Sequence, residues 1–250
     1  METLRDVQCF VRDAQDVASL HELDSLLEAT IKSFGFQFYA LGHHVNVVSA
    51  DQVQIGNHPE TWSPSVHTRE TITEDPVLRA CQNSAVGFKW SDVGSLITLT
   101  TRHKEILSNA HKVGMGEGYT VPVHIPGECL GSCSFAYRVG KKLDEEILPT
   151  AHYVGGFAFE AARRLVRQGA TPERAMSARA ALTPRQLDCV VLIARGKSDW
   201  EAGQILGISH DTVHHHIETA KRKYGVATRT QLVIRTLFDN QLGFEDVILR

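Results

Sequence analysis

The chain has 250 residues, of which 42% are hydrophobic and 22% are charged, and its formal net charge is −3. This length suits one large domain or two ordinary ones, and the composition is that of a globular protein rather than a disordered or fibrous one. The small net charge excludes a basic surface spread over the whole chain, although one part of the chain can still be more basic than another.

Targeting signals and membrane spans are not expected. The N-terminus, METLRDVQCFVRDAQDV, is charged throughout, so it does not resemble a signal peptide. No apolar run approaches the roughly 18 residues that a membrane span needs. The cysteines are odd in number and widely scattered, as in a reduced compartment, and they are Cys9, Cys81, Cys129, Cys133 and Cys189. We therefore expect a cytoplasmic protein with no membrane partner.

The first 168 residues mix helical and strand patterns. Two helices are expected in the first 34 residues, where Leu23, Leu27 and Ile31 recur at helical spacing. Strands with one buried face are expected where apolar and polar residues alternate, at 36–45, 119–125 and 130–139. Further helices are expected at 59–70, 75–84, 99–113 and 143–168. This order predicts an α+β domain at 1–168, built as an α/β/α sandwich around an antiparallel sheet.

A linker and a second domain follow. Residues 169–181 carry small and charged side chains with little apolar periodicity, which predicts a linker. Residues 182–250 show four short helices and no strand pattern, so an all-α domain is expected there. The starts of three of these helices are marked by the capping residues Thr183, Ser198 and Thr228. Two short helices joined by the turn GIS at 207–209 form a helix-turn-helix signature.

Charge supports this division. Eight basic and six acidic residues lie between 182 and 242, a net charge of +2, so the rest of the chain carries −5. Within the basic part, three histidines stand together at 214–216, and helical geometry turns successive side chains by about 100°. They therefore fan over three faces and cannot converge on one metal ion. His210 and His214 have a spacing that could share a metal, but no third ligand is evident nearby.

The helix that carries these histidines has one apolar stripe, formed by Val213, Ile217, Ala220 and Tyr224. His215 projects almost directly away from that stripe, and basic side chains gather at the end of the helix. A solvated helix face is the simpler interpretation of such a pattern. In a helix-turn-helix, the same face fits a helix that enters the major groove of DNA while basic groups reach phosphates.

The C-terminal segment closely resembles the LuxR-type DNA-binding domain of bacterial transcription factors. The residues that match its motifs are Leu182, Thr183, Arg185, Gly196, Lys197, Ser198, Glu201, Ile208, Ser209, Thr212, Val213, His216, Lys223 and Arg229. Two departures are Gln186, where the family usually has Glu, and Gly203 in the "EAG" that replaces "EIA". Glycine costs a helix roughly 1 kcal/mol relative to alanine, so a softer scaffold helix is expected.

This resemblance implies a set of DNA-binding residues. They are Lys197, Ser198, Ser209, Asp211, Thr212, His214, His215, His216, Thr219, Arg222, Lys223 and Arg229. We expect His215 to reach base edges and His216 to support the helix or contact a phosphate, whereas His214 is assigned a contact with the DNA backbone.

Residues from about 20 to 165 resemble the autoinducer-binding domain of quorum-sensing LuxR-type regulators, chiefly through "NHPETWSPSVHTRETITEDPVLRA" and "FKWSD". The resemblance implies an N-acyl-homoserine lactone in a closed pocket between sheet and helices. Trp62 would donate to the lactone carbonyl, and Asp75 would accept from the ligand amide. Trp90 would pack on the lactone ring, and Ser134 would lie near a carbonyl. Core packing is the alternative for both tryptophans, and an N-cap ahead of Pro76 is the alternative for Asp75.

The remaining positions of the expected ligand-binding set are His58, Val66 and Val77. His58 stands where the family usually has tyrosine, and Val66 where it usually has a second aromatic residue. Losing those phenols removes a hydrogen-bond donor and leaves space. The departures imply either an acyl group that differs from the common straight chains, such as a branched, aryl or bulky one, or an acyl carbonyl that is held in another way. A signal that is not a lactone is a further alternative.

The resemblance therefore implies a homodimeric transcription factor that binds a small signal molecule, without a cofactor, and recognises a pseudo-palindromic DNA site. The last predicted helix, 231–240, would support dimerisation, and RNA polymerase would be a partner if the protein is an activator. One alternative is an orphan regulator that acts without a ligand or responds to a signal other than a lactone. Another is a metal or redox sensor that uses Cys129, Cys133 and the histidines. No enzymatic motif is present in the sequence.

Overall fold

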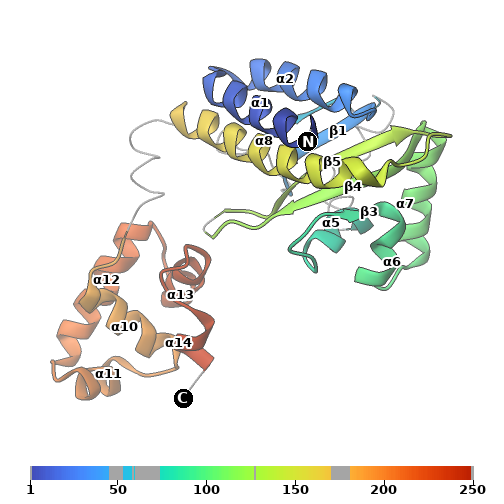
Figure 1. Cartoon of the computed structure of the whole chain (residues 1–250). Helices are drawn as coiled ribbons and strands as arrows, with labels where there is room; N and C mark the ends of the chain where they lie inside the picture. Colours follow the sequence, from blue (N-terminus) through green and yellow to red (C-terminus); the bar gives the residue numbers. More distant parts are fainter. Residues whose placement is uncertain are drawn as a thin grey trace. The chain divides into compact units, whose positions relative to one another are not determined.

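The fold is known from a computed structural model that describes residues 2–44, 53–57, 59, 74–126, 128–169 and 181–248. Residues 2–125 with 129–169 belong to one compact unit, and residues 181–248 belong to a second (Figure 1). The helices in these ranges include none that is long and apolar enough to cross a membrane.

The first unit is built on an antiparallel sheet with the strand order β2-β1-β5-β4-β3. The strands are β1 (Phe38–His43), β2 (Gln54–Gly56), β3 (Phe88–Lys89), β4 (Met115–Val123) and β5 (Gly131–Arg138). The strands predicted at 36–45, 119–125 and 130–139 are confirmed as β1, β4 and β5, although β4 begins earlier, at Met115. Sequence reasoning missed β2 and β3 because two or three residues are too few to show an alternation.

Helices cover both faces of this sheet, which confirms the predicted α/β/α sandwich (Figure 1). One face packs against α1 (Glu2–Asp16), α2 (Leu20–Ser33) and α8 (Leu148–Gln168). The other lies under α5 (Pro76–Cys81), α6 (Val93–Leu96) and α7 (Thr101–Lys112), with a 3-10 turn, η1, at Trp90–Asp92. A second 3-10 turn, η2 at Glu145–Ile147, leads into α8, and its Ile147 packs against the first face. The helix predicted at 59–70 falls almost entirely outside the described residues.

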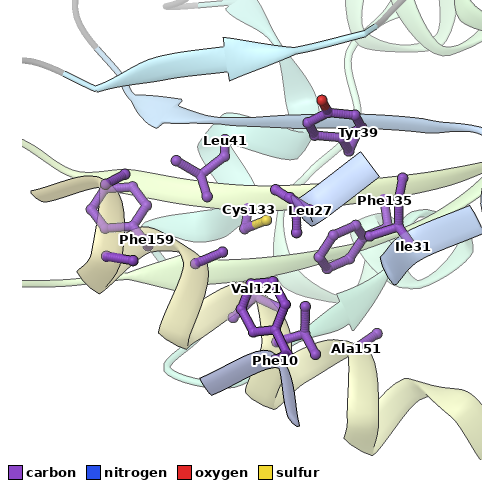
Figure 2. Close-up of a cluster of buried hydrophobic side chains, with 14 of the residues drawn as sticks. Phe10, Leu27, Ile31, Tyr39, Leu41, Val121, Cys133, Phe135, Ala151 and Phe159 are labelled. Carbon is purple, nitrogen blue, oxygen red and sulfur yellow. The ribbon is translucent and has the colours of Figure 1, made fainter. Parts of the chain in front are cut away.

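The first face carries the main hydrophobic core (Figure 2). Leu23, Leu27 and Ile31 of α2 are fully buried there, as their helical spacing predicts, together with Phe135 of β5. Burying each such side chain contributes about 1.5–3 kcal/mol. Gly155 brings α8 close to the sheet, because a Cβ at that position would lie 3.2 Å from Cβ of Cys133 and from Cγ2 of Val121.

The second unit is entirely helical. Its helices are α10 (Pro184–Ala194), α11 (Asp199–Leu206), α12 (His210–Tyr224), α13 (Arg229–Phe238) and α14 (Phe244–Ile248). Thr183, Ser198 and Thr228 cap α10, α11 and α13, each in a reciprocal capping box, as the sequence predicts. The short α14 was not predicted because five residues contain little periodic signal.

Gly203 has a packing role that its low helix propensity does not reveal. A Cβ at this position of α11 would lie 2.7 Å from the carbonyl oxygen of Ile208 and 3.3 Å from the amide nitrogen of His210. The amide of Ile208 donates to the carbonyl of Gly203 at 3.0 Å. Glycine therefore lets α11 approach the turn that precedes α12, which is a structural reason for the departure from alanine.

Candidate ligand-binding face and DNA-binding helix

The sheet face under α5, α6 and α7 carries small and polar side chains. Two neighbouring rungs across β1, β5 and β4 are Ala40–Ser134–Thr120 and Gly42–Ser132–Pro122. Side chains alternate along each strand, so the residues between these positions, such as Leu41 and Cys133, point into the core on the opposite face. A sheet surface of small side chains with a few polar atoms suits a small-molecule ligand.

Trp90 and Ser134 are joined on this face through Thr120. The indole Nε1 of Trp90 donates to Oγ1 of Thr120 at 2.9 Å, and that oxygen lies 2.8 Å from Oγ of Ser134. The Trp90 ring packs against Gly118, where a Cβ would come 2.5 Å from Cδ2 of the indole. Two residues of the expected ligand-binding set are thus brought together.

Sequence reasoning missed Thr120, which is fully buried. The alternation in "YTVPVHI" does indicate its orientation, because Tyr119 and Val121 face the core and Thr120, between them, lies on the other face. The pairing with Ser134 depends on the register between β4 and β5, and the alternation within one strand does not supply that register.

Asp75 is the N-cap of α5. Its Oδ1 accepts from the amides of Val77 at 2.8 Å and Leu78 at 3.3 Å, and the residue is 8% exposed. Burial raises the pKa of the carboxyl, while these two amide donors act in the opposite direction. The capping role named as the alternative for Asp75 is therefore present. Val77 is itself buried, in a cluster with Phe88 and Val93.

Three members of the expected ligand-binding set, His58, Trp62 and Val66, lie outside the described residues. The structure places Asp75, Val77, Trp90 and Ser134 on or beside the same face of the sheet. The ligand-binding roles expected for all seven residues remain predictions.

In the second unit, α12 buries the predicted apolar stripe and exposes the expected DNA-binding face. Val213, Ile217 and Ala220 are at most 1% exposed. The expected contact residues that are exposed are Lys197, Ser198, Ser209, Asp211, Thr212, His214, His215, Arg222, Lys223 and Arg229, while His216 and Thr219 are partly buried. The three histidines lie on different faces, because His214 contacts Asp199 of α11, His215 is exposed and His216 is partly buried.

Several of these side chains already have partners within the unit. Ser209 caps α12 by accepting from the Thr212 amide at 3.1 Å, and Ser198 caps α11. Nζ of Lys223 donates to the carbonyl of Ala181, and Nη2 of Arg222 donates to Oγ1 of Thr219 at 3.1 Å. These contacts hold helix starts and long side chains in place on the exposed face.

Asp199 links three helices of this unit and was not predicted. Its Oδ2 lies 3.2 Å from Nδ1 of His214 on α12, and its Oδ1 lies 3.2 Å from Nη1 of Arg229 on α13. The Oδ1 contact is ionic and lacks the alignment of a hydrogen bond. Asp199 is the least exposed of the three side chains, at 17%. His214 is therefore held towards α11, which the sequence did not indicate.

The cysteines named in the metal or redox alternative lie in different surroundings. Cys133 is fully buried in the core against α8, whereas Cys129 is exposed. Within the ranges that the structure covers, no group of three His, Cys, Asp or Glu side chains is arranged to hold a metal ion.

Comparison with protein families assigns each of the two units to a known family. Residues 19–162 match the "Autoinducer binding domain" family, and residues 180–236 match the family described as "Bacterial regulatory proteins, luxR family". Together these matches cover most of the chain.

Individual relatives agree with the family matches. The transcriptional activator protein BjaR1 of Bradyrhizobium diazoefficiens is 30% identical over 210 residues, which cover 83% of this chain and 84% of the relative. The quorum sensing-dependent regulator RpaR of Rhodopseudomonas palustris is 29% identical, over 86% of each chain. The crystal structure of Escherichia coli SdiA superposes with a TM-score of 0.70 at 20% identity, over 94% of this chain and 96% of SdiA, and so shares the fold. The chain belongs to the LuxR family: it is a quorum-sensing transcription regulator, not an enzyme, with an autoinducer-binding domain followed by a helix-turn-helix DNA-binding domain.

Proposed function

We propose that the small molecule bound by the N-terminal domain is an N-acyl-homoserine lactone-type signal. The observation that carries this proposal is the Trp90–Thr120–Ser134 network, which lines the small-residue face of the sheet near the start of α5. An amide and a lactone offer several polar atoms within a short length, and such atoms need buried donors and acceptors. Trp90 supplies a flat apolar surface for the ring, and Ser134 supplies a hydroxyl for a carbonyl.

Asp75 completes this set as the acceptor for the ligand amide. One of its oxygens, Oδ1, accepts both capping bonds. A carboxylate has two oxygens and about four acceptor sites, so capping α5 leaves it capacity for another donor. The two roles expected for Asp75 are compatible, and the helix fixes the orientation in which the acid meets the ligand.

The variant Asp75→Asn separates capping from ligand binding. Asparagine caps helices about as well as aspartate, so the free energy of unfolding without ligand should change by less than about 0.5 kcal/mol. A hydrogen bond to a charged group contributes roughly 1.5–3 kcal/mol, so affinity for the lactone should fall at least about tenfold. Calorimetric titration measures the affinity, and Asp92→Asn, which changes an exposed acid of η1, is the control. Equal losses of stability and affinity would identify Asp75 as a structural cap only.

We further propose that the regulator acts as a homodimer on a pseudo-palindromic site, with α12 in the major groove of each half-site. The large apolar side chains exposed on α13, Ile234 at 62% and Phe238 at 39%, support a contact between two copies there. If the protein activates transcription, RNA polymerase is a further partner. His215 on the outer face of α12 would read bases, and Arg222 and Lys223 would contact phosphates.

Ligand binding is proposed to raise the folded, DNA-binding population by mass action. The chain purified with and without lactone should then differ in solubility, thermal stability and DNA affinity. Equal values in the two samples would favour an orphan regulator that acts without a ligand. Mass spectrometry of small molecules that co-purify from native cells would identify the signal and would distinguish a lactone from another compound.

A further inference from the structure

A second polar site lies on the ligand-facing side of the sheet, one repeat of the strand pleat away from Ser134. His44 follows β1 and extends its pairing with β5, because its amide donates to the carbonyl of Leu130 at 2.6 Å. Nε2 of the His44 ring lies 2.8 Å from Oγ of Ser132. Ser132 is 5% exposed and lies close to the thiol of Cys81 in α5, whose pKa it lowers.

These groups are uncharged at neutral pH. Burial lowers the pKa of His44 to about 4, and the neighbouring His43 and His124 rings act in the same direction. Burial likewise raises the pKa of the Cys81 thiol to about 12. A neutral imidazole has one donor nitrogen and one acceptor nitrogen. Nδ1 of His44 has no hydrogen bond to another residue that the structure describes, so the ring can bond to an uncharged partner as well as to Ser132.

The distance between the two polar sites is set by the strand. Ser132 and Ser134 point to the same face of β5 and are two residues apart, which separates them by about 7 Å. Trp90 and Thr120 are at the Ser134 end. A ligand whose lactone and amide lie at that end therefore reaches His44 with its acyl group, several bonds beyond the amide.

We infer that His44 and Ser132 form a subsite that selects signals whose acyl group carries an uncharged oxygen, a hydroxyl or a carbonyl, near its far end. A plain hydrocarbon chain at this position would cover the imidazole without bonding to it, and buried polar groups without partners are costly. The inference rests on the proposed function, because it assumes that the lactone end lies at Trp90. It is consistent with one alternative for the departures at His58 and Val66, an acyl group that differs from the common straight hydrocarbon chains.

The test uses two pairs of synthetic lactones that are matched in size. In the first, ω-hydroxyhexanoyl-homoserine lactone is compared with heptanoyl-homoserine lactone. In the second, para-hydroxyphenylpropanoyl-homoserine lactone is compared with its para-methyl analogue. Affinities for the full-length protein are measured by calorimetric titration. We expect the oxygenated member of at least one pair to bind about tenfold more tightly.

The variants His44→Leu and Ser132→Ala should reduce that preference to within about twofold, whereas His111→Leu, an exposed histidine on α7, should leave it intact. If His44→Leu does not fold, Ser132→Ala decides the outcome. Equal affinity within both pairs, or a preference that survives in Ser132→Ala, would overturn the inference and leave the proposed function standing. Binding of none of the four lactones would overturn the proposed function and this inference together.

Discussion

Replacing Thr120 with valine removes a single oxygen from the proposed ligand-binding face of the sheet and nearly preserves the shape of the side chain. That oxygen accepts from the Trp90 indole at 2.9 Å and lies 2.8 Å from the Ser134 hydroxyl. Thr120 is fully buried, so water does not replace the lost partner. The variant thus tests whether the network holds Trp90 in place before the ligand arrives.

The expected magnitude follows from the two lost bonds. Each contributes about 0.5–1.5 kcal/mol, and a buried donor left without a partner costs about 1–3 kcal/mol. We therefore expect Thr120→Val to lower the free energy of unfolding of the N-terminal domain by about 1–3 kcal/mol. In a domain of this size, each kcal/mol corresponds to a fall of roughly 2–4 °C in Tm. Lactone affinity should fall as well, because the indole loses its fixed orientation.

Urea unfolding followed by fluorescence and circular dichroism measures the loss, and Thr98→Val, an exposed threonine, is the matched control. A double-mutant cycle with Ser134→Ala should give a coupling energy of at least about 0.5 kcal/mol, because the two hydroxyls contact each other. A change below about 0.5 kcal/mol in Thr120→Val, or strictly additive effects in the cycle, would refute the reasoning.

Three further outcomes are expected. In α8, Gly156→Ala should stabilise the domain by about 1 kcal/mol, because no atom lies within 4 Å of the added Cβ. Gly155→Ala should lose that gain, because its Cβ would be packed too tightly against the sheet. Equal thermal stabilities of the two variants would contradict this. Burial lowers the pKa of His44 to about 4, so the folded state resists protonation of this ring. Between about pH 7 and pH 4.5 the wild type should therefore lose about 2–3 kcal/mol more stability than His44→Leu, and equal losses would contradict this. Asp199→Asn should lower the free energy of unfolding of the C-terminal domain by about 1 kcal/mol in dilute buffer and by less in about 1 M salt. A loss that does not depend on salt would exclude ion pairing of Asp199 with His214 and Arg229.

The sequence predicts those parts of the fold that depend on local periodicity. The alternation along β1, β4 and β5 and the helical stripe of α2 are visible because each element is long enough to repeat its pattern. The two-residue β3 and the five-residue α14 have no such repeat. Their positions are decided by pairing and packing with residues far away in the chain.

The candidate site is likewise only partly predictable from the sequence. Resemblance to a family points to Trp90 and Asp75 by position, but it does not indicate that Trp90 bonds to Thr120, since that contact depends on how β3 and η1 lie against β4. The Asp199 cluster joins residues that are 15 and 30 positions apart on three helices. A single helical wheel of α12 shows His214 on a flank and gives no information about α11.

The close approach of α8 at Gly155 has a consequence for how ligand occupancy could be sensed. Ser132 and Ser134 face the ligand side of β5, while Cys133 and Phe135, the residues between and after them, face the helix. A Cβ added to Gly155 would lie 3.2 Å from Cβ of Cys133 and 3.3 Å from Cε2 of Phe135. One strand thus separates the proposed ligand-binding face from α8, and Gly155 has no side chain that could take up a displacement. A shift of β5 by a few tenths of an ångström would have to be met by movement of α8, the helix that ends at Gln168.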